Sequence, residues 1–271
     1  MVELQNKYQM GIRRFGLINW LGAYTLYKKE TLRFLNVFGQ TIIGPISSSI
    51  LFLLVISIAL GKDRIDVLGV SYIQFLAPGL ICMAIMQNAF ANTSSSILIS
   101  KVQGNIVDVL MPPLSEFELS FSYALGGMTR GLMVGISVGI TIYLMLPTIE
   151  VSNLAYILYF AFSSSLLLSL LGILCGIWSE KFDHMASVTN FVIVPLTFLS
   201  GTFYTVDRLP EFWGFVANWN PFFYMIDGFR YGFIGYSDSN ILVGMTILFL
   251  GNLFFLACTI YVFKKGYGLR N

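Results

Sequence analysis

The histidine and carboxylates of one short segment are the residues of this sequence most able to perform chemistry together. His184 is the only histidine of the chain, and Glu180 and Asp183 lie just before it. An imidazole beside carboxylates can hold a metal ion or move protons. A lone histidine on a charged loop is far more often solvated, however, and we expect no metal site.

Other catalytic signatures are missing from the sequence. The cysteines stand alone and far apart in apolar stretches, at Cys82, Cys175 and Cys258, so neither a disulfide framework nor a metal-ligand spacing is present. Gly61-Lys62 lacks the first glycine of a nucleotide-binding loop, and there is no dinucleotide-binding glycine pattern and no nucleophile elbow. We expect a chain that is not an enzyme, binds no cofactor of its own and carries no energy source.

The cysteines lie in predicted membrane spans, and the histidine segment lies between two of them. Of the 271 residues, 56% are hydrophobic and only 11% are charged, against roughly 25% charged in soluble domains. Six apolar stretches are long enough to cross a hydrocarbon core of ~30 Å, near residues 38–60, 72–99, 119–146, 154–177, 188–204 and 241–263. We therefore expect an all-α polytopic membrane protein with six transmembrane helices in a domain over residues 37–271.

Residues 1–36 are expected to form a cytoplasmic N-terminal segment with an amphipathic helix in the membrane interface. Apolar side chains recur there at helical spacing: Leu17, Leu21, Tyr24, Leu32 and Leu35. Basic residues lie between them, as in helices that rest on a lipid surface.

The basic residues also predict the orientation. With the N-terminus in the cytoplasm, only four of the sixteen Lys and Arg residues would lie outside: Lys62, Arg64, Arg208 and Arg230. Because cytoplasmic loops carry the excess of positive charge, both termini are expected to be cytoplasmic.

The second span is unusually polar. Asn88, Asn92 and Ser95 share one helical face, which is unfavourable against lipid, so they should face protein or a water-filled path. Hydrogen bonding between helices and contact with a substrate are both open interpretations. Together with Thr197 and Ser200 of the fifth span, these residues form the predicted substrate path.

The third span carries glycines spaced by four: Gly127, Gly131, Gly135 and Gly139. A face without side chains lets another helix approach closely, which predicts a tight helix contact. Arg130 of the same span is expected to lie at its inner end and to extend to the cytoplasmic headgroups. An ion pair inside the membrane is the alternative.

A short cytoplasmic helix is predicted between the second and third spans. Ile106, Val109 and Leu110 would form one apolar face, and Pro112-Pro113 would end the helix. Exposed apolar residues on a cytoplasmic loop need a partner. They could dock into another protein, or the segment could be a re-entrant packing turn.

The stretch from 188 to 236 begins as the fifth span but continues as neither a clean loop nor a further span. Charges such as Asp207 and Glu211 are too costly for hydrocarbon, while the aromatic residues around Trp213 are too apolar for water. Such a segment suits short re-entrant outer helices between spans five and six. Asp227 and Arg230, three residues apart, could pair on one helical face.

An ordered set of motifs in this stretch resembles the permease subunits of ABC-2-type ABC transporters. The motifs are Ser200-Gly201-Thr202-Phe203-Tyr204, then Leu209-Pro210, then Trp213, then Asn220-Pro221-Phe222-Phe223-Tyr224-Met225-Ile226-Asp227-Gly228-Phe229-Arg230. The similarity extends over most of the chain. It implies a permease subunit that forms the transmembrane path for ATP-driven transport, mostly export, of lipids, glycans, drugs or other amphiphiles.

The resemblance also implies partners and their contacts. The partners would be a second copy of the chain in a homodimer, two copies of a cytoplasmic ABC ATPase that binds ATP and Mg, and lipids of the bacterial inner membrane, with no nucleic acid. The short helix between spans two and three would be the coupling helix, with ATPase contacts at Ile106, Val107, Asp108, Val109 and Leu110. An outer gate would contain Trp213, Trp219, Asn220, Pro221, Tyr224, Asp227 and Arg230.

Two other classes of protein compete with a permease subunit. A secondary transporter predicts inverted repeats and buried ionisable residues, and a membrane-embedded lipid-modifying enzyme predicts clustered His, Asp or Arg at one membrane face. Apart from Asp227 and Arg230, the sequence shows neither pattern. The substrate is not named by the sequence, since the outer aromatic residues could stack on sugars or form an interfacial belt.

Overall fold

The computed structural model describes residues 18–60, 67, 69–145, 151–205 and 210–268, and within these ranges the chain is helical with no strand. The long uninterrupted helices are α4 (Tyr72–Val102), α6 (Glu116–Met145), α7 (Leu154–Trp178) and α12 (Ile241–Lys265). Two further segments contain a π-helical turn: η2 (Gly39–Ile43) continues into α3 (Gly44–Leu60), and α8 (Phe182–Val188) continues through η3 (Thr189–Ile193) into α9 (Val194–Leu199). The shorter helices are α2 (Trp20–Leu35), α5 (Ile106–Leu110), α10 (Glu211–Trp219) and α11 (Pro221–Ile234).

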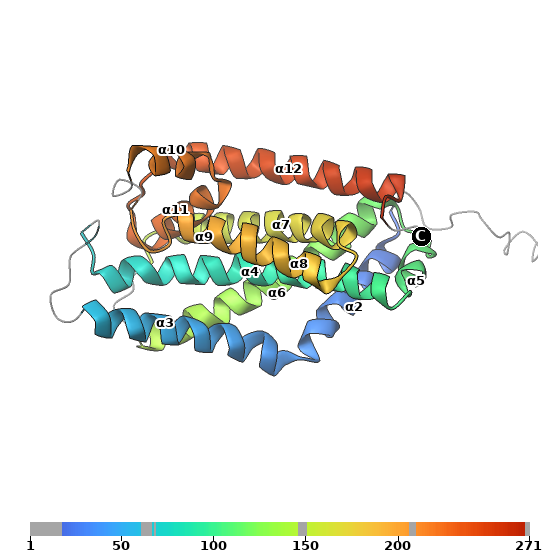
Figure 1. Ribbon diagram of the computed structural model, residues 1–271, viewed down its shortest axis with the longest axis horizontal. Coiled ribbons are helices and arrows are strands. Elements are labelled where there is room, and N and C mark those ends of the chain that lie inside the picture. Colours follow the sequence, from blue (N-terminus) through green and yellow to red (C-terminus); the bar gives the residue numbers. More distant parts are fainter. Residues whose placement is uncertain (1–17, 61–66, 68, 146–150, 206–209, 269–271) are drawn as a thin grey trace, which may run out of the picture.

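The long helices lie side by side in one bundle (Figure 1). Helix α5 and the C-terminal end of α12 lie at one end of it, and α10 and α11 lie at the other. Six of the described helical segments are long and apolar enough to cross a membrane: Gly39–Ile56, Tyr72–Val102, Glu116–Met145, Leu154–Trp178, Phe182–Leu199 and Ile241–Lys265. The predicted all-α fold with six spans is therefore confirmed.

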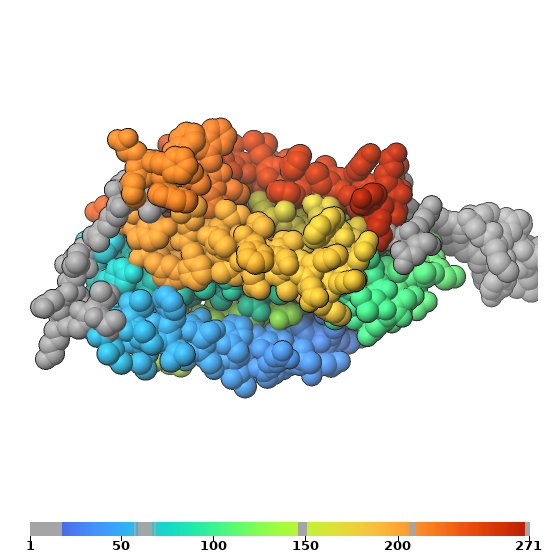
Figure 2. Space-filling view, in the orientation of Figure 1, coloured from blue at the N-terminus to red at the C-terminus, as the bar shows by residue number. Residues whose placement is uncertain are grey.

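Helix α4 forms the centre of the bundle. It packs against both α6 and α7, and 78% of its 18-residue apolar stretch is buried. The first span, the fifth span and α12 are peripheral, because only 22%, 11% and 17% of their corresponding apolar stretches are buried. Figure 2 shows the first and fifth spans on one face of the molecule, with parts of α4 and α6 visible in a furrow between them. The peripheral spans thus keep broad faces free for lipid or for another protein.

The fifth span lies earlier in the sequence than predicted. It runs over Phe182–Leu199 rather than over 188–204, because the charged loop before it is only three residues long. Asp183 belongs to the first turn of α8, where a negative side chain suits the positive end of the helix. At the other end Gly201 adopts φ +70°, a backbone conformation that favours glycine, and the span ends there.

The predicted amphipathic N-terminal helix is present as α2. The Asn19 side chain caps its first turn by accepting a hydrogen bond from the Gly22 N–H at 2.9 Å. One face packs on α6 and buries Leu26, Glu30 and Phe34. Another face leaves apolar side chains exposed: Leu21, Tyr24 and Leu32. The helix is therefore fixed to the bundle on one side and free to contact lipid on another.

Candidate functional site

Three of the four glycines of the predicted register hold α6 against its neighbours: Gly127, Gly131 and Gly135. A Cβ on Gly131 would lie 2.7 Å from the Ile85 carbonyl oxygen of α4, closer than real side chains allow. Gly139 differs, because a Cβ there would meet only Ile81 Cδ1, at 3.6 Å, which is an ordinary contact. The close approach thus covers the middle of α6 and ends before Gly139.

Each row of glycines that allows two helices to approach closely is called a glycine seam. A second glycine seam, which the sequence analysis did not predict, joins α7 to α4. A Cβ on Gly176 would lie 2.7 Å from the Ser94 carbonyl oxygen, and one on Gly172 would collide with Thr93 and with the Phe90 carbonyl oxygen. These two glycines are also spaced by four, so the same small-residue pattern could have revealed them. Both seams place backbone against backbone at the centre of the bundle.

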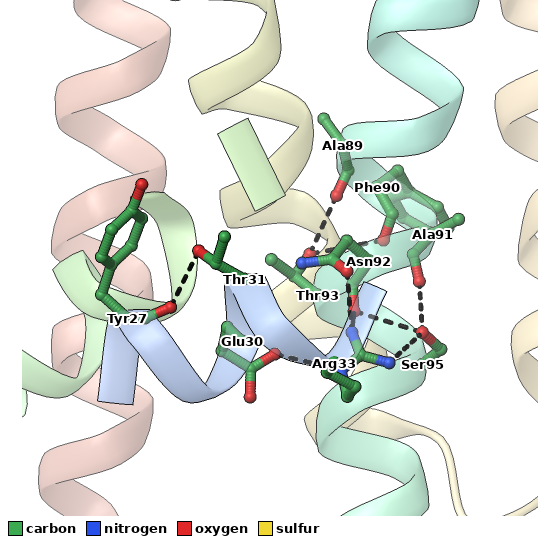
Figure 3. Close-up of polar contacts among 10 residues, drawn as sticks. All are labelled: Tyr27, Glu30, Thr31, Arg33, Ala89, Phe90, Ala91, Asn92, Thr93 and Ser95. Atoms are coloured by element: carbon green, nitrogen blue, oxygen red, sulfur yellow. Dashed lines mark hydrogen bonds and ion pairs between the residues drawn. The ribbon is translucent and has the colours of Figure 1, made fainter. Parts of the chain in front are cut away.

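A buried polar cluster fastens α2 to α4 (Figure 3). The Arg33 guanidinium donates to the Asn92 carbonyl oxygen at 2.6 Å and to Asn92 Oδ1 at 2.8 Å, and more weakly to Ser95 Oγ at 3.4 Å. Its Nε lies 3.4 Å from Glu30 Oε2. Glu30 and Asn92 are fully buried. Two predicted path residues, Asn92 and Ser95, therefore take part in hydrogen bonds between helices.

Arg130 lies closer to the middle of its helix than predicted. It is roughly 21 Å from the start of α6 at 1.5 Å per residue, rather than at the inner end. Its Nη2 donates to Asn88 Oδ1 of α4 at 3.4 Å, and Asn88 Nδ2 donates to the Ala84 carbonyl oxygen at 3.0 Å. Because the side chain points to α4, the prediction that Arg130 extends to the headgroups is wrong.

The predicted path residues of the fifth span lie inside the fold. Thr197 and Ser200 are fully buried, and each hydroxyl donates to a carbonyl oxygen one turn earlier in the same helix. Asn88 and Ser95 of α4 are half-buried. Of the predicted set, these two are the residues that can be reached from outside a single copy of the chain.

The predicted helix between the second and third spans is present as α5, but its free face differs from the expected one. Ile106 and Val109 are buried in a cluster with Leu26 of α2. Val107 and Met111 are instead the exposed apolar residues, at 52% and 76%. The expectation that Ile106 and Val109 face a partner is therefore corrected, because the chain's own helices cover them.

A groove of about 590 Å³ lies between α2 and the segment that contains α5. Its walls are mainly apolar and include Leu21, Leu26, Val109, Pro112 and Leu114. Lys29 and Asp108 add one charge of each sign. The groove and the exposed face of α5 together form a surface that can receive the side chains of another protein.

The Asn220-Pro221 motif joins helices α10 and α11 to the end of the fifth span. Asn220 Oδ1 accepts a hydrogen bond from the Phe222 N–H at 3.0 Å and caps α11, with Pro221 at the first helical position. Asn220 Nδ2 donates to Ser200 Oγ at 2.8 Å and to the Leu196 carbonyl oxygen at 3.0 Å. One buried side chain thus starts α11 and fastens it to α9.

Asp227 and Arg230 lie on α11 but contact different partners, so the predicted pairing between them is not formed. Asp227 accepts three hydrogen bonds from residues 238–239, the shortest from Ser239 Oγ at 2.6 Å. Arg230 donates to the Gly201 carbonyl oxygen at 2.6 Å and stacks on Phe75 of α4 at 3.8 Å. Each buried charge therefore fixes a different neighbouring segment against α11.

The aromatic residues predicted for the outer gate divide into two groups. Trp213 and Trp219 of α10 are exposed, at 49% and 77%. Tyr224 of α11 is half-buried and donates to the Asn218 carbonyl oxygen at 3.0 Å. Asp207, the first charge of the predicted outer stretch, lies outside the described residues.

Replacing Asn220 with alanine is expected to destabilise the α11 end of the bundle by about 1–3 kcal/mol, because a helix cap is lost and buried groups lose a partner. Amide hydrogen exchange of the purified protein is the measurement, and exchange should accelerate in α11. Asn240 caps α12 in the same way at an exposed position, so Asn240→Ala is the matched control and should affect only the first turn of α12. Unchanged protection of α11 in Asn220→Ala would contradict the role of Asn220 in fastening α11 to α9.

The lone histidine lies beside an aromatic ring. The centroids of the His184 and Trp178 rings are 5.7 Å apart. Among the residues that the structure describes, no group of three His, Cys, Asp or Glu side chains could hold a metal ion.

Six apolar helices, of which α6 and α7 pack on the central α4 through glycines, define a polytopic membrane protein. The chain belongs to the ABC-2 type transporter family, whose sequence profile matches residues 22–234. It is similar to the inner membrane transport permease YadH of Escherichia coli K12, with 35% identity over 254 residues, 93% of this chain and 98% of that protein. It is also similar to nodulation protein J of Rhizobium leguminosarum bv. viciae, with 26% identity over 241 residues, 86% of this chain and 89% of that one. The chain is therefore a transport permease of the ABC-2 type.

Proposed function

We propose that the chain is the membrane subunit of an ATP-driven exporter and that an ABC ATPase binds at its α5 end. The observation that carries this proposal is the exposed apolar pair of Val107 in α5 and Met111 directly after it, next to the apolar groove beside α2. Exposed apolar side chains at a cytoplasmic end need a protein partner, and membership of the ABC-2 type family supports an ATPase in that role. ATP and Mg bind to that partner, and the permease itself performs no catalysis.

We further propose that two copies of the chain associate around the transport path. The first and fifth spans are the weakly buried helices on either side of the furrow in Figure 2, and each exposes an amide side chain, Gln40 in η2 and Asn190 in η3. An amide is unfavourable against lipid, so these faces suit a polar path or a contact between copies. A closed dimer with twofold symmetry is the simplest assembly that covers the same face on both copies.

The proposal includes a location and a substrate class. We place the protein in the bacterial inner membrane with both termini cytoplasmic, which is supported by the distribution of basic residues. Helices α10 and α11 then lie at the outer end of the path, where they serve as its gate. The substrate is an amphiphile such as a lipid, a glycan or a drug-like molecule, and lipids of the membrane surround the complex.

Purification of the tagged permease from its native membranes, with a search of the co-purified proteins and of the adjacent reading frames for a Walker-type ATPase, tests this function. We expect a complex of two permeases and two ATPases, and ATP-dependent movement of an amphiphile in proteoliposomes. A permease that recovers no ATPase, in membranes that show no ATP-dependent transport, would refute the proposal.

A further inference from the structure

Arg130 is a charged side chain that has little to neutralise it. It lies near the middle of the 30-residue helix α6, and its partner Asn88 lies near the middle of the 31-residue helix α4. In the part of the chain that the structure describes, Arg130 has no carboxylate within 4.0 Å. Among those residues it makes a single hydrogen bond, of 3.4 Å to the neutral Asn88, and its buried Nε has no partner there. A charge at this depth is costly unless it is paired or hydrated, and such residues mark substrate or ion pathways.

The neighbouring Arg33 has a different environment. It contacts the buried carboxylate of Glu30 at 3.4 Å and two oxygen atoms of Asn92 at 2.6 and 2.8 Å. Its positive charge is therefore offset within the protein. Asn88 and Asn92, which accept from Arg130 and Arg33, lie one helical turn apart on α4, so the two guanidinium groups are neighbours. Two arginines and one glutamate leave one positive charge unbalanced in this cluster, and it resides on Arg130.

Packing alone does not account for Arg130. Arg230 also has a buried Nε without a partner among the described residues, but it is fully buried, donates to a carbonyl oxygen at 2.6 Å and stacks on an aromatic ring at 3.8 Å. Arg130 is half-buried, and its one hydrogen bond to another described residue is the longer one to Asn88. The bond from Asn88 Nδ2 to the Ala84 carbonyl oxygen turns Asn88 Oδ1 toward Arg130. The guanidinium is thus oriented but not enclosed, and the N–H groups of its terminal nitrogens can donate to a carboxylate or a phosphate.

We propose that Arg130, positioned by Asn88, binds the anionic headgroup of an amphiphile inside the membrane. The headgroup carries a phosphate or a carboxylate, and its negative charge balances the unpaired positive charge of Arg130. Asn88 and Ser95 continue the polar face of α4 on which the headgroup lies. The inference rests on the proposed transport function and narrows its substrate class to anionic amphiphiles.

Equilibrium binding of radiolabelled lysophosphatidylglycerol to the purified full-length permease in neutral detergent tests this inference. We expect saturable binding, and much weaker binding of lysophosphatidylcholine with the same acyl chain, whose headgroup has no net charge. Arg130→Gln should weaken binding of the anionic lipid about tenfold or more, as expected for loss of a hydrogen bond between charged groups. Arg130→Lys should retain most of it.

Lys264→Gln is the matched control, because it removes the same charge from an exposed position at the end of α12 and should leave binding unchanged. If Arg130→Gln does not fold, Asn88→Ala keeps the charge and should still weaken binding by releasing the guanidinium. Equal affinity for the two lipids, or wild-type affinity in the folded variants, would overturn the inference. Displacement of the label by inorganic phosphate alone would also overturn it, because the site would then serve a free anion.

The binding assay uses neither ATP nor the ATPase, so its result is independent of the proposed transport function. Loss of binding in Arg130→Gln alongside an intact ATPase complex supports both proposals. Failure of the lipid to bind alongside an intact complex overturns only this one.

Discussion

Replacing Gly131 with leucine is expected to prevent the folded bundle from assembling. Even the first carbon of a side chain at this position would lie 2.7 Å from the Ile85 carbonyl oxygen and 2.8 Å from Ser165 Oγ. Helix α6 would therefore be pushed away from both α4 and α7. The smaller change Gly131→Ala should lower the free energy of unfolding by about 1–3 kcal/mol, the usual cost of an overpacked core.

Thermal unfolding of the purified permease, followed by tryptophan fluorescence and size-exclusion chromatography, measures this effect. Gly139 belongs to the same glycine register but has room for a methyl group, since its nearest neighbour would be 3.6 Å away. Gly139→Ala is therefore the matched control and should unfold at the wild-type temperature. A wild-type unfolding temperature for Gly131→Leu would mean that α6 does not approach α4 as closely as described.

Replacing Met111 with aspartate is expected to abolish binding of the ATPase and to leave the permease folded. Met111 is 76% exposed, and Val107, one helical turn earlier, is 52% exposed. A carboxylate buried in that contact without a partner costs several kcal/mol, which corresponds to a loss of roughly a hundredfold or more in affinity. Pull-down with a tagged ATPase, together with thermal unfolding of the variant, measures both effects.

Two other variants sharpen this test. Tyr236→Asp places the same charge at an exposed position between α11 and α12, at the other end of the bundle, and should leave ATPase binding intact. Leu110→Asp should instead destabilise the permease, because Leu110 packs against the buried cluster of α2 and α5. Undiminished recovery of the ATPase by Met111→Asp would place the docking site away from α5.

The spans and the outer helix break could be predicted because their signals are local. Long apolar stretches predict the six membrane helices, and the Asn220-Pro221 pair predicts the start of α11. The start of the fifth span could not be placed, because Asp183 looks like a loop residue and instead lies in a first helical turn. The depth of Arg130 was misplaced for a similar reason, since α6 begins at Glu116, before the apolar stretch.

The contacts between distant residues could not be predicted from spacing. In α5 the apolar residues surround the helix, so periodicity does not show that Ile106 is buried while Val107 is exposed. The bond from Arg33 to Asn92 joins residues that are 59 positions apart, and neither side chain alone identifies the other. Asp227 and Arg230 have the spacing of a pair, but the surrounding segments supply closer partners to each.

In the proposed function the chain is one half of a dimer, and ATP binding to the partner ATPase moves the two halves relative to each other. The distance between two spin labels at Trp219→Cys, one on each copy, tests this most directly, with Cys82, Cys175 and Cys258 replaced. Trp219 is 77% exposed at the end of α10, so a label there does not disturb the packing. We predict a distance distribution that shifts when nucleotide is trapped on the ATPase, and that does not shift in Met111→Asp. An absence of dipolar coupling, or one distribution with and without nucleotide, would contradict the proposal.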